Sequence, residues 1–341
     1  MKKLTKIGVS ALAGSLVAAS AQAGELSASG TWELTYKSDD KEQTGNPFGS
    51  KSAVSLSGSG DVDGLGTASF FAQINDNNPS GYTSHEISLD MGDMGKFGFD
   101  QGVGTYGISV IDDKSPTAWE ESWHNTNNSS AQLTHTGGSG GVLGYANSFG
   151  GFDLSVEYAP ALTSADNGDG VAGGDDTSLA NGSNINFNIQ NSSLIEGLAF
   201  GFGAGESEYD DTVAGSGNDD GSSVVGYANY TFGSITAGVT LSDSSNARGT
   251  DNANAGGREV EAYGISMAVN ENLSVSYNEH NTTFRKKGSD GVDVEQEATG
   301  IAISYTMGGA TLAIQNNSMD NVGGTQSSND EITEISLSLA F

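Results

Sequence analysis

The chain has 341 residues, with 50 glycines and no cysteine, and its formal net charge is −30. The lack of cysteine excludes disulfide and thiolate chemistry, and the acidity argues against nucleic-acid binding, which needs a basic face. Only 35% of the residues are hydrophobic, which is low for a packed globular core. A disordered acidic chain is excluded by 13 Phe, 11 Tyr and 3 Trp and by a recurring apolar–polar alternation, so we expect a structure with a polar interior.

Residues 1–23 have the pattern of a signal peptide. Lys2, Lys3 and Lys6 form a positive start, an apolar stretch follows, and Ala21-Gln22-Ala23 is a typical cleavage site. We therefore predict a mature chain of residues 24–341. No later stretch has the ~20 continuous apolar residues of a membrane-spanning helix, so a location in a membrane would require a β-barrel.

The segment 24–37 shows the pattern that recurs along the chain. Leu34 and Tyr36 share one parity, and Glu33 and Thr35 take the other. Side chains of a strand point alternately to opposite faces, so this pattern predicts a strand with one apolar and one polar face. A soluble sandwich of two sheets alternates in the same way, so one strand does not decide between the two folds.

The same signal predicts sixteen strands. They lie near 24–37, 51–61, 65–75, 82–91, 96–103, 141–148, 152–160, 183–190, 196–206, 221–231, 234–243, 258–269, 272–283, 295–306, 310–318 and 331–341.

The connections between these strands alternate between tight turns and longer loops, with 76–81 as a short exception. This asymmetry is typical of outer-membrane barrels, which have short periplasmic turns and long extracellular loops. An even number of strands lets the first strand pair with the last, which ends on Phe341. We therefore predict an all-β fold, a 16-stranded antiparallel transmembrane β-barrel; a soluble periplasmic sandwich is the alternative.

Two further segments carry a resemblance to a known family. Gly95-Lys96-Phe97-Gly98-Phe99 precedes the long third connection, and Val142–Pro160 resembles a strand–turn–strand hairpin from which the usual turn proline is missing. With the signal peptide and the terminal phenylalanine, the chain resembles the general porins of Gram-negative bacteria, in particular the alphaproteobacterial ones. The resemblance implies an outer-membrane homotrimer in contact with lipid and lipopolysaccharide, and a third loop folded into the lumen.

The third connection, about 104–140, is the longest, and loops of this length are usually functional or disordered. If it folds inward, its charges lie where the channel is narrowest, and carboxylates there favour cations over anions. The alternative is a solvated external loop. We assign Ala131–Thr136 to the return of this loop or to an extension of the sixth strand. The candidate constriction residues are Asp112, Asp113, Lys114, Glu120 and Glu121.

The predicted inner wall carries acids but no cluster of arginines, and here the chain departs from the family. Glu33, Asp153 and Glu157 have the parity of the polar face, whereas the basic residues fall near the strand ends and none is predicted in mid-strand on that face. We therefore expect a cation-preferring or weakly selective channel for small hydrophilic solutes. A substrate-selective channel on the same barrel remains open.

Asp166-Asn167-Gly168-Asp169-Gly170 places oxygen ligands at a calcium-like spacing. An EF-hand would also need a downstream glutamate and flanking helices, which are missing. A Ca²⁺ site at Asp166, Asn167 and Asp169, and with it a calcium-binding surface or structural protein, is one interpretation; acids that solvate an external loop are the other. We expect no other cofactor.

We expect no enzymatic activity. A barrel hydrolase would need a histidine beside a serine or aspartate at the lumen rim. His85 and His135 share parity with apolar neighbours, and His280 is predicted near an outer strand end.

Overall fold

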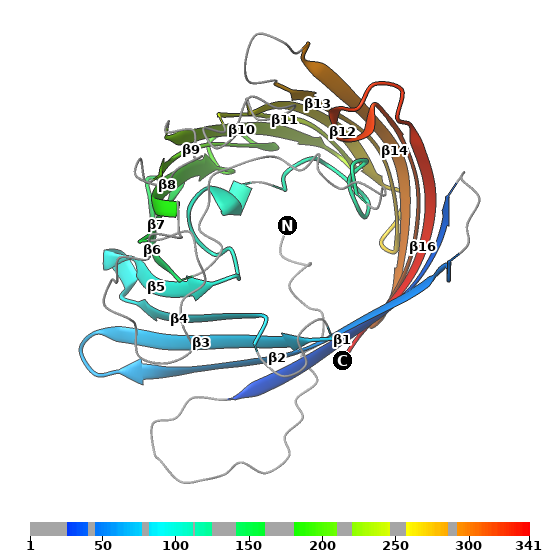
Figure 1. Cartoon of the computed structure of the whole chain (residues 1–341). Coiled ribbons are helices and arrows are strands. Elements are labelled where there is room, and N and C mark those ends of the chain that lie inside the picture. The colour runs from blue at the N-terminus through cyan, green and yellow to red at the C-terminus, as the bar shows by residue number, and fades with distance from the viewer. Residues whose placement is uncertain are drawn as a thin grey trace.

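Sixteen antiparallel strands form a closed barrel in which each strand pairs with its neighbours in sequence and β1 pairs with β16 (Figure 1). The predicted fold class is thus confirmed. The computed structural model describes residues 26–39, 45–76, 82–111, 113–124, 141–160, 181–209, 220–245, 257–285 and 292–341. The predicted signal peptide and the segment Ala131–Thr136 lie outside these ranges and stay predictions.

The strands are β1 (Ser27–Asp39), β2 (Phe48–Val62), β3 (Gly66–Asn75), β4 (Ser84–Asp90), β5 (Lys96–Gln101), β6 (Val142–Phe149), β7 (Phe152–Ala159), β8 (Asn181–Asn191), β9 (Leu198–Tyr209), β10 (Gly221–Phe232), β11 (Ile235–Ser245), β12 (Arg258–Ala268), β13 (Leu273–Phe284), β14 (Val294–Met307), β15 (Ala310–Asp320) and β16 (Asp330–Ala340). Three short 3₁₀ turns accompany them, namely η1 (Gly92–Met94), η2 (Gly107–Ile111) and η3 (Val322–Gly324). Within the described ranges, no helix has the length and apolar character needed to cross a bilayer.

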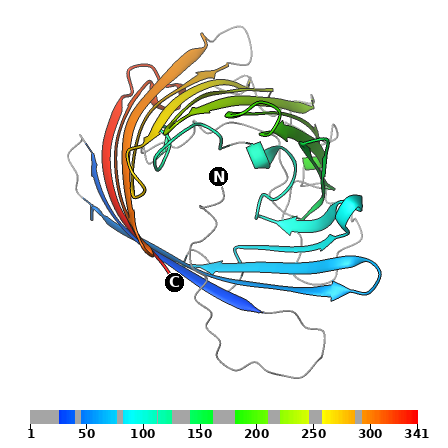
Figure 2. The ribbon, with the colours of Figure 1, turned by 180° about the vertical axis from the view of Figure 1, so that it is seen from behind.

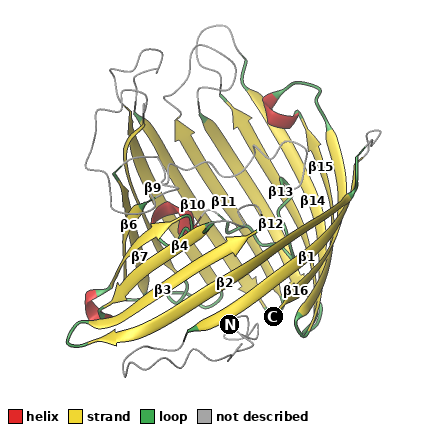
Figure 3. Cartoon of the chain, turned by 60° about the horizontal axis from the view of Figure 1, so that its bottom comes forward, coloured by secondary structure: helices red, strands yellow, loops and turns green. Residues whose placement is uncertain are grey.

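The two ends of the barrel differ in the way that the sequence predicts. β10 and β11 are joined by Gly233 and Ser234 alone, and β14 and β15 by Gly308 and Gly309, whereas the connections at the opposite end are longer. Figure 3 shows the C-terminus at the end with the tight turns. The connection after β3 covers 76–83 rather than 76–81, because β4 begins at Ser84, and this makes it longer than the tight turns.

The barrel closes at the C-terminal residue, as predicted. The N–H of Gly30 donates to the carbonyl of Phe341 at 3.1 Å, and the N–H of Phe341 donates back at 2.9 Å. Leu34 lies opposite Leu337, and Tyr36 lies opposite Ile335. This pairing gives hydrogen-bond partners to the backbone N–H and C=O groups along the edges of the first and last strands. No open edge remains between these two strands.

The alternating pattern separates the two faces of the wall. Ile335 and Leu337 are 37% and 38% exposed on the outer face, while Glu334 and Ser336 of the same strand point inward and are 4% and 1% exposed. Tyr277 of β13, four residues from the tight-turn end of this strand, also faces outward and is 44% exposed.

The two faces of the wall predict different responses to a buried charge. Ile303 faces outward and Ser304 faces inward on the same strand. We expect Ile303→Arg to lower the free energy of unfolding in lipid vesicles by about 2–4 kcal/mol, because it places a charge in the apolar band. The matched variant Ser304→Arg should lower it far less; equal losses from the two variants, measured by denaturant titration, would contradict an outer face in contact with lipid.

Candidate functional site

The described residues of the third connection, between β5 and β6, lie inside the barrel. Figures 1 and 2 show this segment within the ring of strands from both ends of the barrel. Every wall residue that binds it faces inward in the strand register. The described parts of this third loop, residues 102–111 and 113–124, therefore fold into the lumen as the resemblance implied.

The first half of the loop is anchored to β7, β8 and β10. The N–H of Gly107 donates to Ser155 Oγ at 2.9 Å, and the N–H of Ile108 donates to Asn186 Oδ1 at 2.7 Å. Ile108 and Ile111 are fully buried against Val225 and Tyr227 of β10. Polar side chains of the wall thus accept hydrogen bonds from the loop N–H groups. The apolar contact of Ile108 and Ile111 with β10 excludes water beside these hydrogen bonds.

The second half continues around the same wall. Asn229 Nδ2 of β10 donates to the carbonyl of Lys114 at 2.7 Å. Asn278 Nδ2 of β13 donates to the carbonyl of Pro116 at 2.8 Å, and Asn317 Nδ2 of β15 donates to the carbonyl of His124 at 2.9 Å. The loop therefore covers the inner wall from β7 to β15.

The wall formed by β16, β1 and β2 faces the loop from the other side. Lys51 Nζ lies 2.8 Å from Glu33 Oε2, and the Lys51 side chain is 66% exposed, which shows that water reaches this inward face. Ser336 Oγ donates a hydrogen bond to Glu33. Glu120 of the loop interacts electrostatically with both Lys51 and Glu334. The loop and this wall therefore form the candidate constriction.

The prediction that no basic residue lies in mid-strand on the inner face is wrong for Lys51. β2 begins at Phe48, three residues earlier than predicted, so Lys51 lies inside the strand. It stands opposite Glu33 in the register and shares its face. His280 lies four residues from the loop end of β13, faces inward, is 1% exposed and has its ring 6.2 Å from that of Trp123.

Three of the predicted constriction residues are at least partly accessible on the loop. Asp113 is exposed. The Lys114 ammonium lies 5.8 Å from the centre of the Tyr227 ring, and Glu120 Oε2 lies 3.5 Å from His124 Nδ1. Asp112 lies outside the described residues.

Glu121 is covered rather than facing the bore. It is 6% exposed, and its carboxylate accepts a hydrogen bond from Trp123 Nε1. Burial raises the pKa of the Glu121 carboxyl to about 7, and the neighbouring charge of Asp113 contributes to the rise, while the Trp123 hydrogen bond opposes it. Glu121 is thus partly protonated near neutral pH.

The three acids predicted on the lumen wall have different surroundings. Glu33 is paired with Lys51. Asp153, at the tight-turn end of β7, is exposed and accepts a hydrogen bond from Ser148 Oγ. Glu157 is 2% exposed because the third loop covers it, and Asn186 Nδ2 donates to it at 3.2 Å.

The sequence model of the family described as Gram-negative porin matches residues 8–341. The chain belongs to this family. It is therefore an outer-membrane channel for passive diffusion, and the loop inside its barrel lies where permeating solutes must pass. A search of curated protein sequences finds no match.

Solved porin structures have the same fold as this porin. OmpF of Salmonella typhi in complex with daunomycin is 10% identical with a TM-score of 0.70, covering 93% of this chain and 98% of that chain. The anion-selective porin of Comamonas acidovorans is 15% identical with a TM-score of 0.62, covering 93% and 100%. OmpT of Vibrio cholerae, in a trimer form folded in vitro, is 13% identical with a TM-score of 0.61, covering 94% and 100%. At such identities the likeness shows the fold alone.

No group of three or more His, Asp or Glu residues that could hold a metal ion occurs in the described part of this porin. The candidate calcium ligands Asp166, Asn167 and Asp169 lie outside that part, so this site stays a prediction.

Sequence reasoning missed the residues that hold the loop. Asn184, Asn186 and Asn188 alternate with apolar residues along β8, and all three are buried beneath or beside the loop. Asparagine is depleted in strands. Its repeated occurrence at inward positions was the available signal for a docking surface.

The buried Glu121 predicts a pH dependence. Between the ordinary value of 4.5 and about 7, the folded porin binds more protons than the unfolded chain. Its free energy of unfolding should therefore fall as pH rises through this window, by up to about 1.4 kcal/mol per pH unit from this group, and stay level above it.

Glutamine cannot ionise, so Glu121→Gln isolates this contribution. We expect the stability of the wild type relative to Glu121→Gln, measured by denaturant unfolding in detergent, to be greater at pH 5 than at pH 8. If the difference is the same at both pH values, the carboxyl group does not titrate in this window.

Proposed function

We propose that this porin is a water-filled, cation-preferring channel for small hydrophilic solutes. The observation that carries this proposal is the imbalance of charge on the inner face. Lys51 and Lys96 each lie 2.8 Å from a glutamate, so each contributes little net field. Asp113 and Asp153 are exposed, and Glu120 of the loop interacts electrostatically with the opposite wall.

The mechanism combines size exclusion with an electrostatic bias. The third loop narrows the lumen along the wall from β7 to β15, which limits the size of solutes. Exposed carboxylates in a lumen with low-dielectric walls raise the local concentration of cations and lower that of anions.

The fold does not decide the sign of the selectivity. A structural neighbour with the same architecture is described as anion-selective. The proposal for this porin therefore depends on its own carboxylates.

We further propose a homotrimer whose outer faces contact outer-membrane lipid and lipopolysaccharide. One neighbour is described in a trimer form. Exposed apolar side chains such as Ile303 and Leu337 on the outer wall require lipid or protein to cover them in the membrane.

Reversal potentials in planar bilayers under a KCl gradient test the selectivity. The wild type should favour K⁺ over Cl⁻, and replacing Glu120 and Asp113 by Gln and Asn should lower the permeability ratio by up to about fivefold, since a unit charge in water at contact distance contributes about 1 kcal/mol. Lys51→Gln should raise the ratio.

Glu331→Gln provides the matched control. Glu331 is an exposed acid on the outer face of β16, where it accepts a hydrogen bond from Asn316, so its removal should leave the ratio unchanged. A reversal potential that favours Cl⁻ in the wild type would overturn the proposal. Conductance that saturates with one solute would instead indicate a substrate-selective channel.

A further inference from the structure

The ring of Tyr106, at the start of the third loop, lies against a part of the inner wall that has no side chains. Gly98 of β5 and Gly144 of β6 stand directly opposite each other in the strand register. A Cβ atom on either glycine would overlap the Tyr106 ring, which is fully buried. Only a residue without a Cβ allows such a close approach. We call Gly98 and Gly144 the glycine platform.

The hydroxyl end of Tyr106 is held by Glu86 of β4. The hydroxyl donates to Glu86 Oε1 at 3.1 Å, and Thr105 Oγ1, also from the loop, donates to Glu86 Oε2 at 2.8 Å. Lys96 Nζ lies 2.8 Å from Glu86 Oε1 and 5.6 Å from the centre of the Tyr106 ring. One carboxylate thus connects two loop residues to a wall lysine, and hydrogen bonds to a charged group are among the stronger ones.

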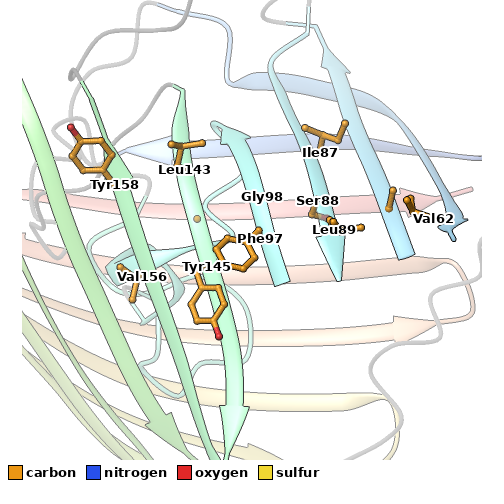
Figure 4. A pocket seen from close by; sticks show the side chains of 12 residues that line it. Val62, Ile87, Ser88, Leu89, Phe97, Gly98, Leu143, Tyr145, Val156 and Tyr158 are labelled. Carbon is orange, nitrogen blue, oxygen red and sulfur yellow. The ribbon is translucent and has the colours of Figure 1, made fainter. Parts of the chain in front are cut away.

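The opposite side of the platform faces outward. Gly98 and Gly144 lie at the floor of an apolar groove on the outer surface, beside Phe97 and Tyr145, whose rings are 4.6 Å apart (Figure 4). At this point the wall consists of backbone alone. Tyr106 therefore supplies the side chain that fills the inner face here, and no wall residue can replace it.

The loop changes direction immediately after Tyr106. Gly107 has a φ of 66°, in the left-handed region that favours glycine. The next residue, Ile108, is already bound to β8 and packed against β10. Tyr106 thus lies two residues before the anchor at Ile108, and the exposed Asp113 and the partly exposed Glu120 come later in the loop.

We propose that Tyr106, seated on the glycine platform and bound by Glu86, is a positioning residue that sets the cross-section of the channel. This inference rests on the proposed channel function. In this view the start of the loop controls the pore size, whereas the charged residues proposed to set ion selectivity come later in the loop.

Two variants test the platform by opposite means. Tyr106→Ala removes the ring, and Gly144→Ala inserts a methyl group where the ring lies. For each we expect single-channel conductance to change, with a rise of roughly 1.5- to 3-fold for Tyr106→Ala as the loop leaves the wall and the lumen widens. Liposome swelling should show that larger sugars enter. Tyr106→Phe keeps the ring on the platform and removes only the hydrogen bond to Glu86, so its size limit should lie between those of the wild type and Tyr106→Ala.

The double variant separates a specific contact from a general disturbance. If the ring and the platform act together, Tyr106→Ala with Gly144→Ala should have the conductance of Tyr106→Ala alone, because the inserted methyl group then meets no ring. Additive effects would overturn the proposal. Gly226→Ala is the control, since a Cβ there has no neighbour closer than 3.7 Å.

The outcomes distinguish the two levels of inference. A wild type without conductance in bilayers refutes the channel itself. A conducting wild type whose conductance and sugar limit are unchanged in Tyr106→Ala refutes the positioning role alone. Folding is checked by the heat-modifiable gel shift of each variant, and Tyr106→Ala remains informative if Gly144→Ala does not fold.

Discussion

The structure depends on one constraint, that no backbone N–H or C=O group remains unpaired at the edge of the sheet in a membrane. The barrel meets it by pairing β1 with β16, down to the two hydrogen bonds between Gly30 and Phe341. Closure in turn produces an interior that is isolated from lipid. A polar inner face, with only 35% of the residues hydrophobic, is stable for this reason, although the same composition would be poor for a globular core.

The interior is organised by a loop that the wall holds through side-chain amides. Asn186, Asn278 and Asn317 bond to backbone groups of the third loop at three places around the barrel. The backbone N–H and C=O groups of a loop inside a closed barrel have no neighbouring strand to pair with. The side chains of inward-facing asparagines supply the missing hydrogen-bond partners. The apolar contacts of Ile108 and Ile111 add a water-free anchor at one end.

The same loop decides which charges face water. Glu157 and Glu121 are buried by it, whereas Asp113 stays exposed and Lys51 on the uncovered wall is 66% exposed. The field inside the channel is therefore a property of the docked loop rather than of the total number of acids. Lys51 and Lys96, each 2.8 Å from a glutamate, cancel part of that field locally.

Sequence alone determined the strands, their faces and the closure, because side-chain alternation with a period of two and the spacing of turns are local properties. The resemblance to the porins also indicated that the longest connection folds into the lumen. The sequence did not determine that Glu157 is covered, that Lys51 faces inward or that Tyr106 fits on Gly98 and Gly144. These outcomes depend on contacts between residues far apart in the chain, such as Asn317 with His124, and on where β2 begins, and neither is encoded in the local pattern.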